Sequence, residues 1–112
     1  MKNMLNFLAV ERVKNALLEV TKEVYHYEAG NKTERYIVFS EDAEASGLHG
    51  DNKKLSQAIQ GTIDLFTKIE NDEWAAGIQD TMQRNRIGFR LGSVQYEDET
   101  QYIHYQWIFE VS

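Results

Sequence analysis

The feature that most constrains the fold is an unbroken alternation near the C-terminus, where every second side chain is large and apolar. Ile103, Tyr105, Trp107, Phe109 and Val111 occupy these positions. Successive side chains of a β-strand point to opposite faces of its sheet, so these residues share one face. The pattern predicts a half-buried strand with its apolar face against the core.

The opposite face of this strand mixes apolar and polar side chains. Such a mixture suits a solvated sheet face, and it also suits a subunit interface that retains water. We therefore name its residues as a candidate subunit interface: Tyr102, His104, Gln106, Ile108 and Glu110.

A second strand precedes the first, and the acidic segment 97–100 forms the turn between them. Ile87, Phe89 and Leu91 alternate along this strand. Gly92 interrupts the alternation, which predicts a β-bulge before the strand continues. The C-terminal quarter of the chain therefore reads as a hairpin.

Residues 4–24 are predicted to form an amphipathic helix. Apolar side chains recur every three or four positions and fall on one stripe. Leu8 and Leu18 lie outside that stripe, either as ordinary exposed leucines or as contacts for a partner. The stripe consists of Val10, Val13, Leu17, Val20 and Val24.

Residues 72–85 are predicted to form a second helix, capped by Asn71. Asp72 and Glu73 complement the positive end of the helix dipole. Its predicted buried face comprises Trp74, Gly77, Ile78, Thr81 and Met82.

The remaining segments complete an α+β fold. Residues 24–41 read as a β-hairpin around a Gly-Asn turn, and residues 58–67 read as a strand rich in β-branched side chains. The expected order is α-β-β-β-α-β-β, a mostly antiparallel sheet with two packed helices. We expect residues 1–112 to form one domain, since 112 residues suffice for one and not for two.

Composition argues against several classes of function. The net charge is −6, which disfavours tight binding to nucleic acid or to anionic membranes. The chain has no cysteine, so disulfides, thiolate metal sites and cysteine nucleophiles are ruled out. We expect a protein that is neither an enzyme nor dependent on a cofactor or metal, because its three histidines are isolated in sequence.

The acidic segment 41–52 is predicted to be an exposed, mobile loop. Its acids do not have the spacing of a calcium-binding loop. It is either a solvated loop or a docking element for a protein partner. The candidate docking residues are Glu41, Asp42, Glu44, His49 and Asp51.

The order of these motifs resembles the small tail terminator, or tail completion, proteins of long-tailed bacteriophages and prophages. The helix leads into "VYHYEAGNKTERYIVFSE", then "LHGDNKKL" precedes a strand ending in "IDLFTK". The chain closes on "YEDETQYIHYQWIF", which looks like the strand–turn–strand ending of that family. The resemblance covers almost the full length, and it rests on the order of structural motifs.

The resemblance implies a non-enzymatic virion assembly protein. Family members form a hexameric ring that caps the finished tail tube and joins the tail to the head, while DNA passes through without specific binding. The implied partners are the tail tube protein and the head–tail connector proteins, with no membrane partner. The implied location is the phage tail or neck, with the host cytoplasm during assembly.

Two other functions remain open from the sequence. One is a small monomeric protein-interaction or adaptor domain, which would never assemble on tail tubes. The other is a small-ligand-binding protein, which would have a defined cavity with convergent polar groups.

Overall fold

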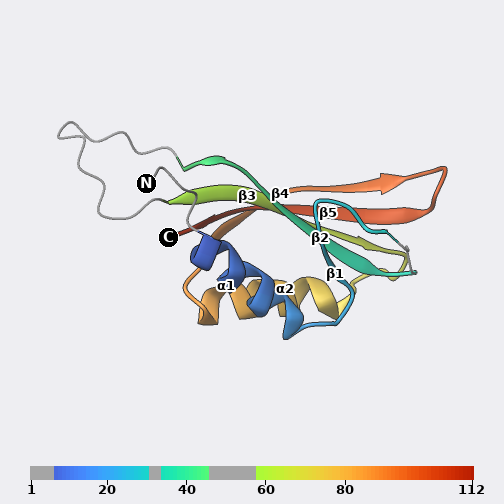
Figure 1. Ribbon diagram of the computed structural model, residues 1–112. Coiled ribbons are helices and arrows are strands. Elements are labelled where there is room, and N and C mark those ends of the chain that lie inside the picture. Colours follow the sequence, from blue (N-terminus) through green and yellow to red (C-terminus); the bar gives the residue numbers. More distant parts are fainter. Residues whose placement is uncertain (1–6, 31–33, 46–57) are drawn as a thin grey trace.

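The computed structural model describes residues 7–30, 34–45 and 58–112, which form two helices and a five-stranded sheet (Figure 1). The elements in chain order are α1 (Phe7–Leu18), β1 (Val24–His26), β2 (Tyr36–Glu44), β3 (Ile59–Thr67), α2 (Glu73–Arg84), β4 (Gly88–Glu97) and β5 (Tyr102–Val111). The predicted α+β class and element order are confirmed.

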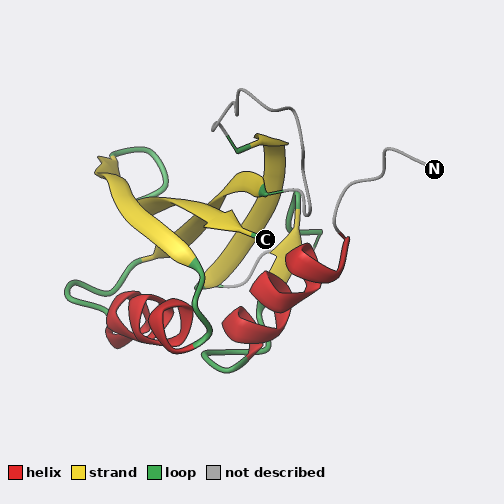
Figure 2. Ribbon diagram, turned by 90° about the vertical axis from the view of Figure 1, so that its left-hand side faces the viewer, coloured by secondary structure: helices red, strands yellow, loops and turns green. Residues whose placement is uncertain are grey.

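The strands lie in the order β1-β2-β3-β5-β4, so β1 and β4 are the two edge strands. Every pairing is antiparallel except that of β1 with β2. Both helices lie against the same face of the sheet, as Figures 1 and 2 show from two directions. We call this the helix-covered face and the other the open face.

The core lies between the helices and the helix-covered face. Val13 and Leu17 of α1 and Ile78 and Met82 of α2 are fully buried there. Across the sheet, alternate residues of β3 are buried and the residues between them are half-buried. The alternation in β5 holds, and its buried members are Trp107, Phe109 and Val111.

Helix α1 ends at Leu18, six residues before the predicted end. Its last turn tightens, with the Glu19 amide donating to the Ala16 carbonyl at 3.1 Å and the Val20 amide to Leu17 at 2.9 Å. Val20 and Val24 still pack against the core, although Val24 does so from β1. The apolar spacing was therefore right about burial and wrong about helix length.

The predicted hairpin of residues 24–41 is wrong. Its two strands exist, but β1 runs parallel to β2, with Val24 opposite Ile37 and His26 opposite Phe39. Apolar periodicity identifies strands but carries no information on their direction. The chain leaves β1 through Tyr27, which has a positive φ of 73°.

Helix α2 begins one residue later than the predicted cap implies, because Asp72 is the N-cap. Its carboxylate accepts a hydrogen bond from the Trp74 amide at 2.9 Å and from the Thr67 hydroxyl at 2.6 Å. The Arg35 guanidinium lies 2.8 Å from the same carboxylate and stacks 3.7 Å over the Trp74 ring. Asn71, the predicted cap, instead has a positive φ of 55°. The buried Asp72 charge is thus fully compensated and fixes the start of α2 against the sheet.

The predicted bulge at Gly92 is confirmed by a register shift between Leu91 and Ser93. Beyond the bulge, the β4–β5 hairpin extends past the ends of both helices (Figure 1). None of the helices in the described segments has the length and apolarity to span a membrane.

Candidate functional site

The predicted interface residues of β5 lie together on the open face. Pairing places His104 opposite Phe66, Gln106 opposite Asp64 and Ile108 opposite Thr62. Tyr102, His104, Gln106 and Ile108 are half-buried, and Glu110 is exposed.

Asp64 is the centre of a polar network on this face. The His104 Nε2 atom lies 2.8 Å from Asp64 Oδ1, and the Gln106 amide donates to the same oxygen at 2.9 Å. The side chains of Asp64 and His104 are only 15% and 20% exposed. A carboxylate with so little solvent needs such donors, so the network stabilises the open face.

An aromatic cluster borders this network. Phe66 stacks on His104 with ring centroids 4.2 Å apart and on Tyr36 at 4.9 Å. Tyr102 meets the Tyr36 and Phe66 rings edge-on at 5.9 and 6.0 Å. Most of the predicted interface side chains thus contact their own chain, and their role between subunits remains a prediction.

The predicted acidic loop is wrong over its first part. Glu41, Asp42 and Glu44 belong to β2, which pairs with β3 as far as Glu44. The sequence predicts a loop here because acidic residues are rare in strands. The strand accommodates them with a register shift between Glu41 and Ala43, which leaves Asp42 without a β3 partner. His49 and Asp51 lie outside the described residues.

Glu41 is held by two side chains at the β1 edge. The His26 Nε2 atom lies 2.7 Å from one carboxylate oxygen, and the Tyr27 hydroxyl donates to the other at 2.8 Å. The Glu41 side chain is only 8% exposed. Burial alone would raise the pKa of the Glu41 carboxyl, but these hydrogen bonds outweigh it and hold the pKa below its ordinary value.

The structure keeps two of the histidines apart. His26 lies at the β1 edge and stacks on Phe39, with centroids 4.6 Å apart, whereas His104 lies on the open face. His49 falls outside the described residues. Within residues 7–30, 34–45 and 58–112, no group of three His, Cys, Asp or Glu side chains is placed to hold a metal ion.

The free edge of the sheet carries a surface that the sequence analysis did not single out. Leu91, Val94 and Tyr96 of β4 are 46%, 49% and 60% exposed, and we call them the β4 apolar strip. They point to the same side as the helices, because Leu91 pairs with the buried Trp107 and Val94 with Tyr105. Their alternation was visible, but only the position of β4 at the edge shows that they stay uncovered.

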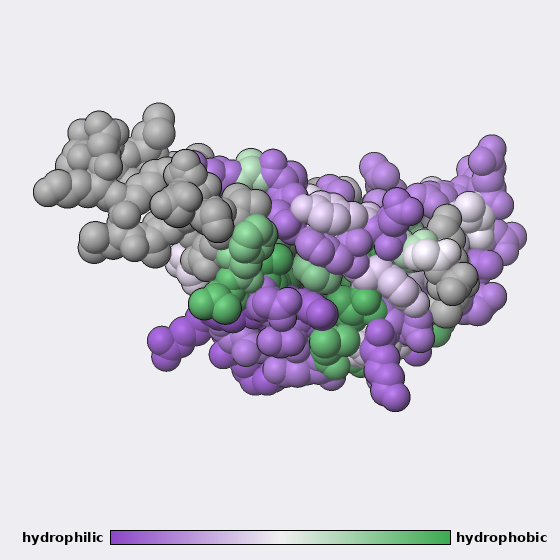
Figure 3. Space-filling model, viewed as in Figure 1, coloured by the Kyte–Doolittle hydropathy of each residue, from purple (hydrophilic) through white to green (hydrophobic). Residues whose placement is uncertain are grey.

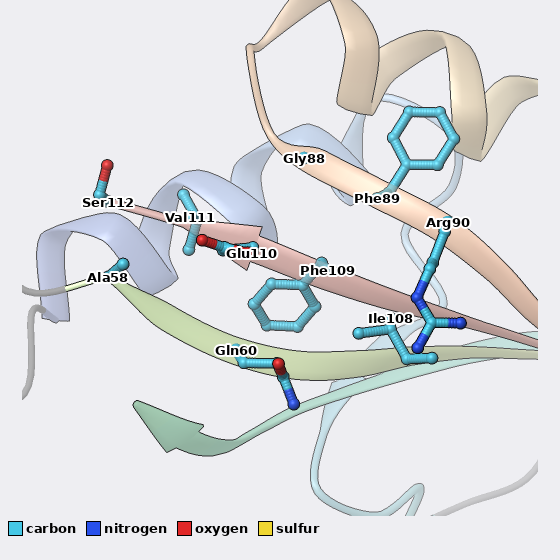
Figure 4. A pocket seen from close by; sticks show the side chains of 10 residues that line it. All are labelled: Ala58, Gln60, Gly88, Phe89, Arg90, Ile108, Phe109, Glu110, Val111 and Ser112. Atoms are coloured by element: carbon cyan, nitrogen blue, oxygen red, sulfur yellow. The ribbon is translucent and has the colours of Figure 1, made fainter. Parts of the chain in front are cut away.

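A hollow of about 390 Å³ lies at the start of β4, between the ends of β3 and β5. Figure 4 shows Arg90 lying over β5 beside Ile108, while the Phe89 ring points the other way, towards α2. Gln60 and Glu110 also line this hollow. The base of β4 therefore presents a cation on the open face and apolar groups on the other.

A larger groove of about 660 Å³ lies at the opposite edge, between α1 and the strands β1 and β2. We call it the α1–β1 groove. Its apolar walls are Phe7, Val10, Val24 and Phe39, and its charged lining includes Glu11, Lys14, Glu28 and Glu41. Exposed apolar residues also lie on α1, among them Leu8 at 80% and Leu18 at 42% exposure. Figure 3 shows hydrophobic surface (green) in the region of α1.

Comparison with known proteins identifies the fold. No protein-family model matches the sequence. None of the curated proteins matches it either. Among solved structures, a chain in the virion of a native gene transfer agent (GTA) particle is similar, with a TM-score of 0.53 and 15% sequence identity. The similarity covers 96% of this chain and 92% of that chain, so the two share one fold over nearly their whole lengths.

Proposed function

We propose that the protein is a structural subunit of a phage-like virion, which caps the tail tube as an oligomeric ring and joins the tail to the head. The observation that carries this proposal is the fold shared with a chain of the GTA virion, over 96% of this chain. A shared fold does not by itself imply a shared function. The order of sequence motifs, which resembles tail terminator proteins, is an independent reason for the same assignment.

Two physical features support the proposal. The chain has exposed apolar residues along the edge strand β4 and on α1, where a monomer gains nothing from them. Its net charge of −6 suits a ring through which DNA slides, because an acidic lumen repels phosphates. The protein would then act in the virion neck, after assembly in the host cytoplasm.

The test has two stages. The mass of the purified chain is measured by light scattering over a concentration series, and the most concentrated fraction is imaged by electron microscopy. We expect closed rings, the usual product of head-to-tail contacts whose rotation closes. The rings are then mixed with uncapped tail tubes, and capping is scored as tubes that stop growing.

A protein that stays monomeric at every concentration and leaves tube growth unchanged would contradict the proposal. That result would favour the monomeric adaptor domain. Rings that do not cap tubes would also overturn the tail role, while leaving self-assembly intact. A chain that is monomeric alone but caps tubes as a ring would support the proposal, since contact with the tube can drive assembly.

A further inference from the structure

We propose that neighbouring copies join edge to edge, with the β4 apolar strip of one copy entering the α1–β1 groove of the next. The proposal rests on the self-assembly proposed above, but it does not require that the assembly sit on a tail. The occupant of the groove is thus a second copy of this chain.

The strip and the groove lie at opposite edges of the sheet but at the same level along its strands. Leu91 pairs with Trp107, Trp107 with Ile63, and Ile63 with Phe39. The row continues to His26 of β1, which lines the groove. A second row runs from Val94 through the sheet to Ile37 and Val24. A copy displaced sideways therefore brings Leu91 and Val94 level with the groove of its neighbour.

The two surfaces also face the same side of the sheet. Leu91 and Val94 share the helix-covered side with Trp107 and Tyr105. The groove lies on that side too, because α1 forms one of its walls. Among its apolar walls, Phe7 is 58% exposed, so contact would remove Phe7 and the β4 apolar strip from water.

Opposite charges flank the apolar contact. Arg90 stands in one row with Ile108, Thr62 and Ser40, next to the acidic end of β2. Arg86 and Arg90 are exposed at the start of β4, and Asp42 and Glu44 are exposed at the end of β2. Edge-to-edge contact at equal level would bring these opposite charges together, which favours this register over others.

Beyond His26, the described strands leave the edge of β2 open to the start of β4 of a neighbouring copy. In the described residues, β1 covers β2 only as far as Phe39, and residues 40–44 have β3 as their one strand neighbour. The β4 strand runs antiparallel to β2 within one copy, as its pairing with β5 requires. A copy displaced sideways would keep that direction and present the start of β4 to the end of β2. The contact is head-to-tail, so it leads to rings or filaments and not to a closed dimer.

Disulfide cross-linking tests the geometry, because the native chain has no cysteine. Ala43→Cys and Gly88→Cys stand in one row across the sheet and alter neither the apolar nor the charged contact. A Cβ at Gly88 meets nothing closer than 3.5 Å. Within one copy the two positions are three strand spacings apart, about 14 Å, which is too far for a disulfide.

We expect a mixture of the two single variants to yield the mixed dimer, and the double variant to yield a ladder of cross-linked oligomers. The control pairs Ala43→Cys with Gln83→Cys, an exposed position on α2, and should not cross-link. Dimers of Gly88→Cys with itself would show a β4-to-β4 contact and overturn the proposal. Absence of the mixed dimer under conditions in which the wild-type chain forms oligomers would also overturn it.

A matched pair of substitutions tests the apolar contact. Val94 and Ile69 are both 49% exposed, so glutamate at either position is equally tolerable in the monomer. We expect Val94→Glu to weaken self-association by about tenfold or more, and Ile69→Glu to leave it unchanged. Equal effects would overturn the proposal. Rings that depend on Val94 but fail to cap tubes would contradict the tail role and leave the interface standing.

Discussion

The two faces of the sheet are stabilised in different ways, although the same strands build both. On the helix-covered face, Ile63, Leu65 and Trp107 are buried against the helices. On the open face, their neighbours in sequence, Asp64 and Gln106, are half-buried and hydrogen-bonded to each other. Burial of apolar area stabilises the first face, and satisfied hydrogen bonds and ring contacts stabilise the second.

This difference between the two faces changes where a partner is expected. The open face has no helix cover among the described residues, yet its central side chains already bind one another. The β4 apolar strip has large exposed side chains, and a partner would bury them at little polar cost. The sheet edge formed by β4, which carries exposed apolar side chains, is therefore a stronger candidate for assembly than the open face, which only lacks covering helices in the described residues.

The largest effect is expected on the helix-covered face, from Gly61→Ala. A Cβ at this position would lie 2.6 Å from the Phe109 ring and still closer to the Ser40 carbonyl oxygen. The backbone of β2 cannot move without disturbing its pairing, so we expect a loss of about 3 kcal/mol in the free energy of unfolding. Urea denaturation monitored by circular dichroism measures this loss.

The control for Gly61→Ala is Gly77→Ala in α2, where the new Cβ would meet Val20 at an ordinary 3.6 Å. We expect that variant to gain up to about 1 kcal/mol, because alanine favours a helix more than glycine does. Similar losses for both variants would mean that the close approach of Gly61 to Ser40 and Phe109 does not cause the loss.

A smaller effect is expected on the open face, from Asp64→Ala. The substitution removes the acceptor that His104 and Gln106 share, and it leaves both side chains half-buried. We expect a loss of about 2 kcal/mol, and a smaller loss for Asp64→Asn, which keeps one acceptor oxygen. The same denaturation experiment measures both variants. An Asp64→Ala variant as stable as the wild type would show that the network contributes nothing to the open face.

Much of the fold was predictable because burial leaves a periodic trace in the sequence. The alternation in β5 and the second helix follow from apolar spacing, the strand at 58–67 from its β-branched side chains, and the bulge from Gly92. The end of α1 and the direction of β1 did not follow, since Val20 and Val24 pack against the core, partly buried, in either arrangement. Strand direction depends on tertiary pairing, which local patterns do not encode.

The candidate surfaces were less predictable. The open-face residues of β5 were found because they alternate with the core residues. Their Asp64 partner was not, since it lies 40 positions away from His104 in the chain. The acidic segment has a loop-like composition, and nothing local in the sequence indicates that His26 and Tyr27 hold Glu41 in β2. Which strands lie at the sheet edges, and which distant residues pair, depends on the topology. The topology therefore determines where the β4 apolar strip and the α1–β1 groove lie.

The smallest effect is expected where the helix-covered face ends, from Glu41→Gln. The pKa of the Glu41 carboxyl is lowered in the fold, so the carboxylate stabilises the protein above its ordinary pKa of 4.5. That stability is lost as pH falls through the lowered pKa. We expect Glu41→Gln to cost about 1 kcal/mol at neutral pH and the difference to shrink in acid. Urea denaturation of the wild type and the variant, from neutral to acidic pH, measures this difference. The other charged residues of the groove, Glu11, Lys14 and Glu28, are present in both proteins, so their titration cancels in the comparison. A difference that stays constant would mean that His26 and Tyr27 bind the neutral side chain equally well.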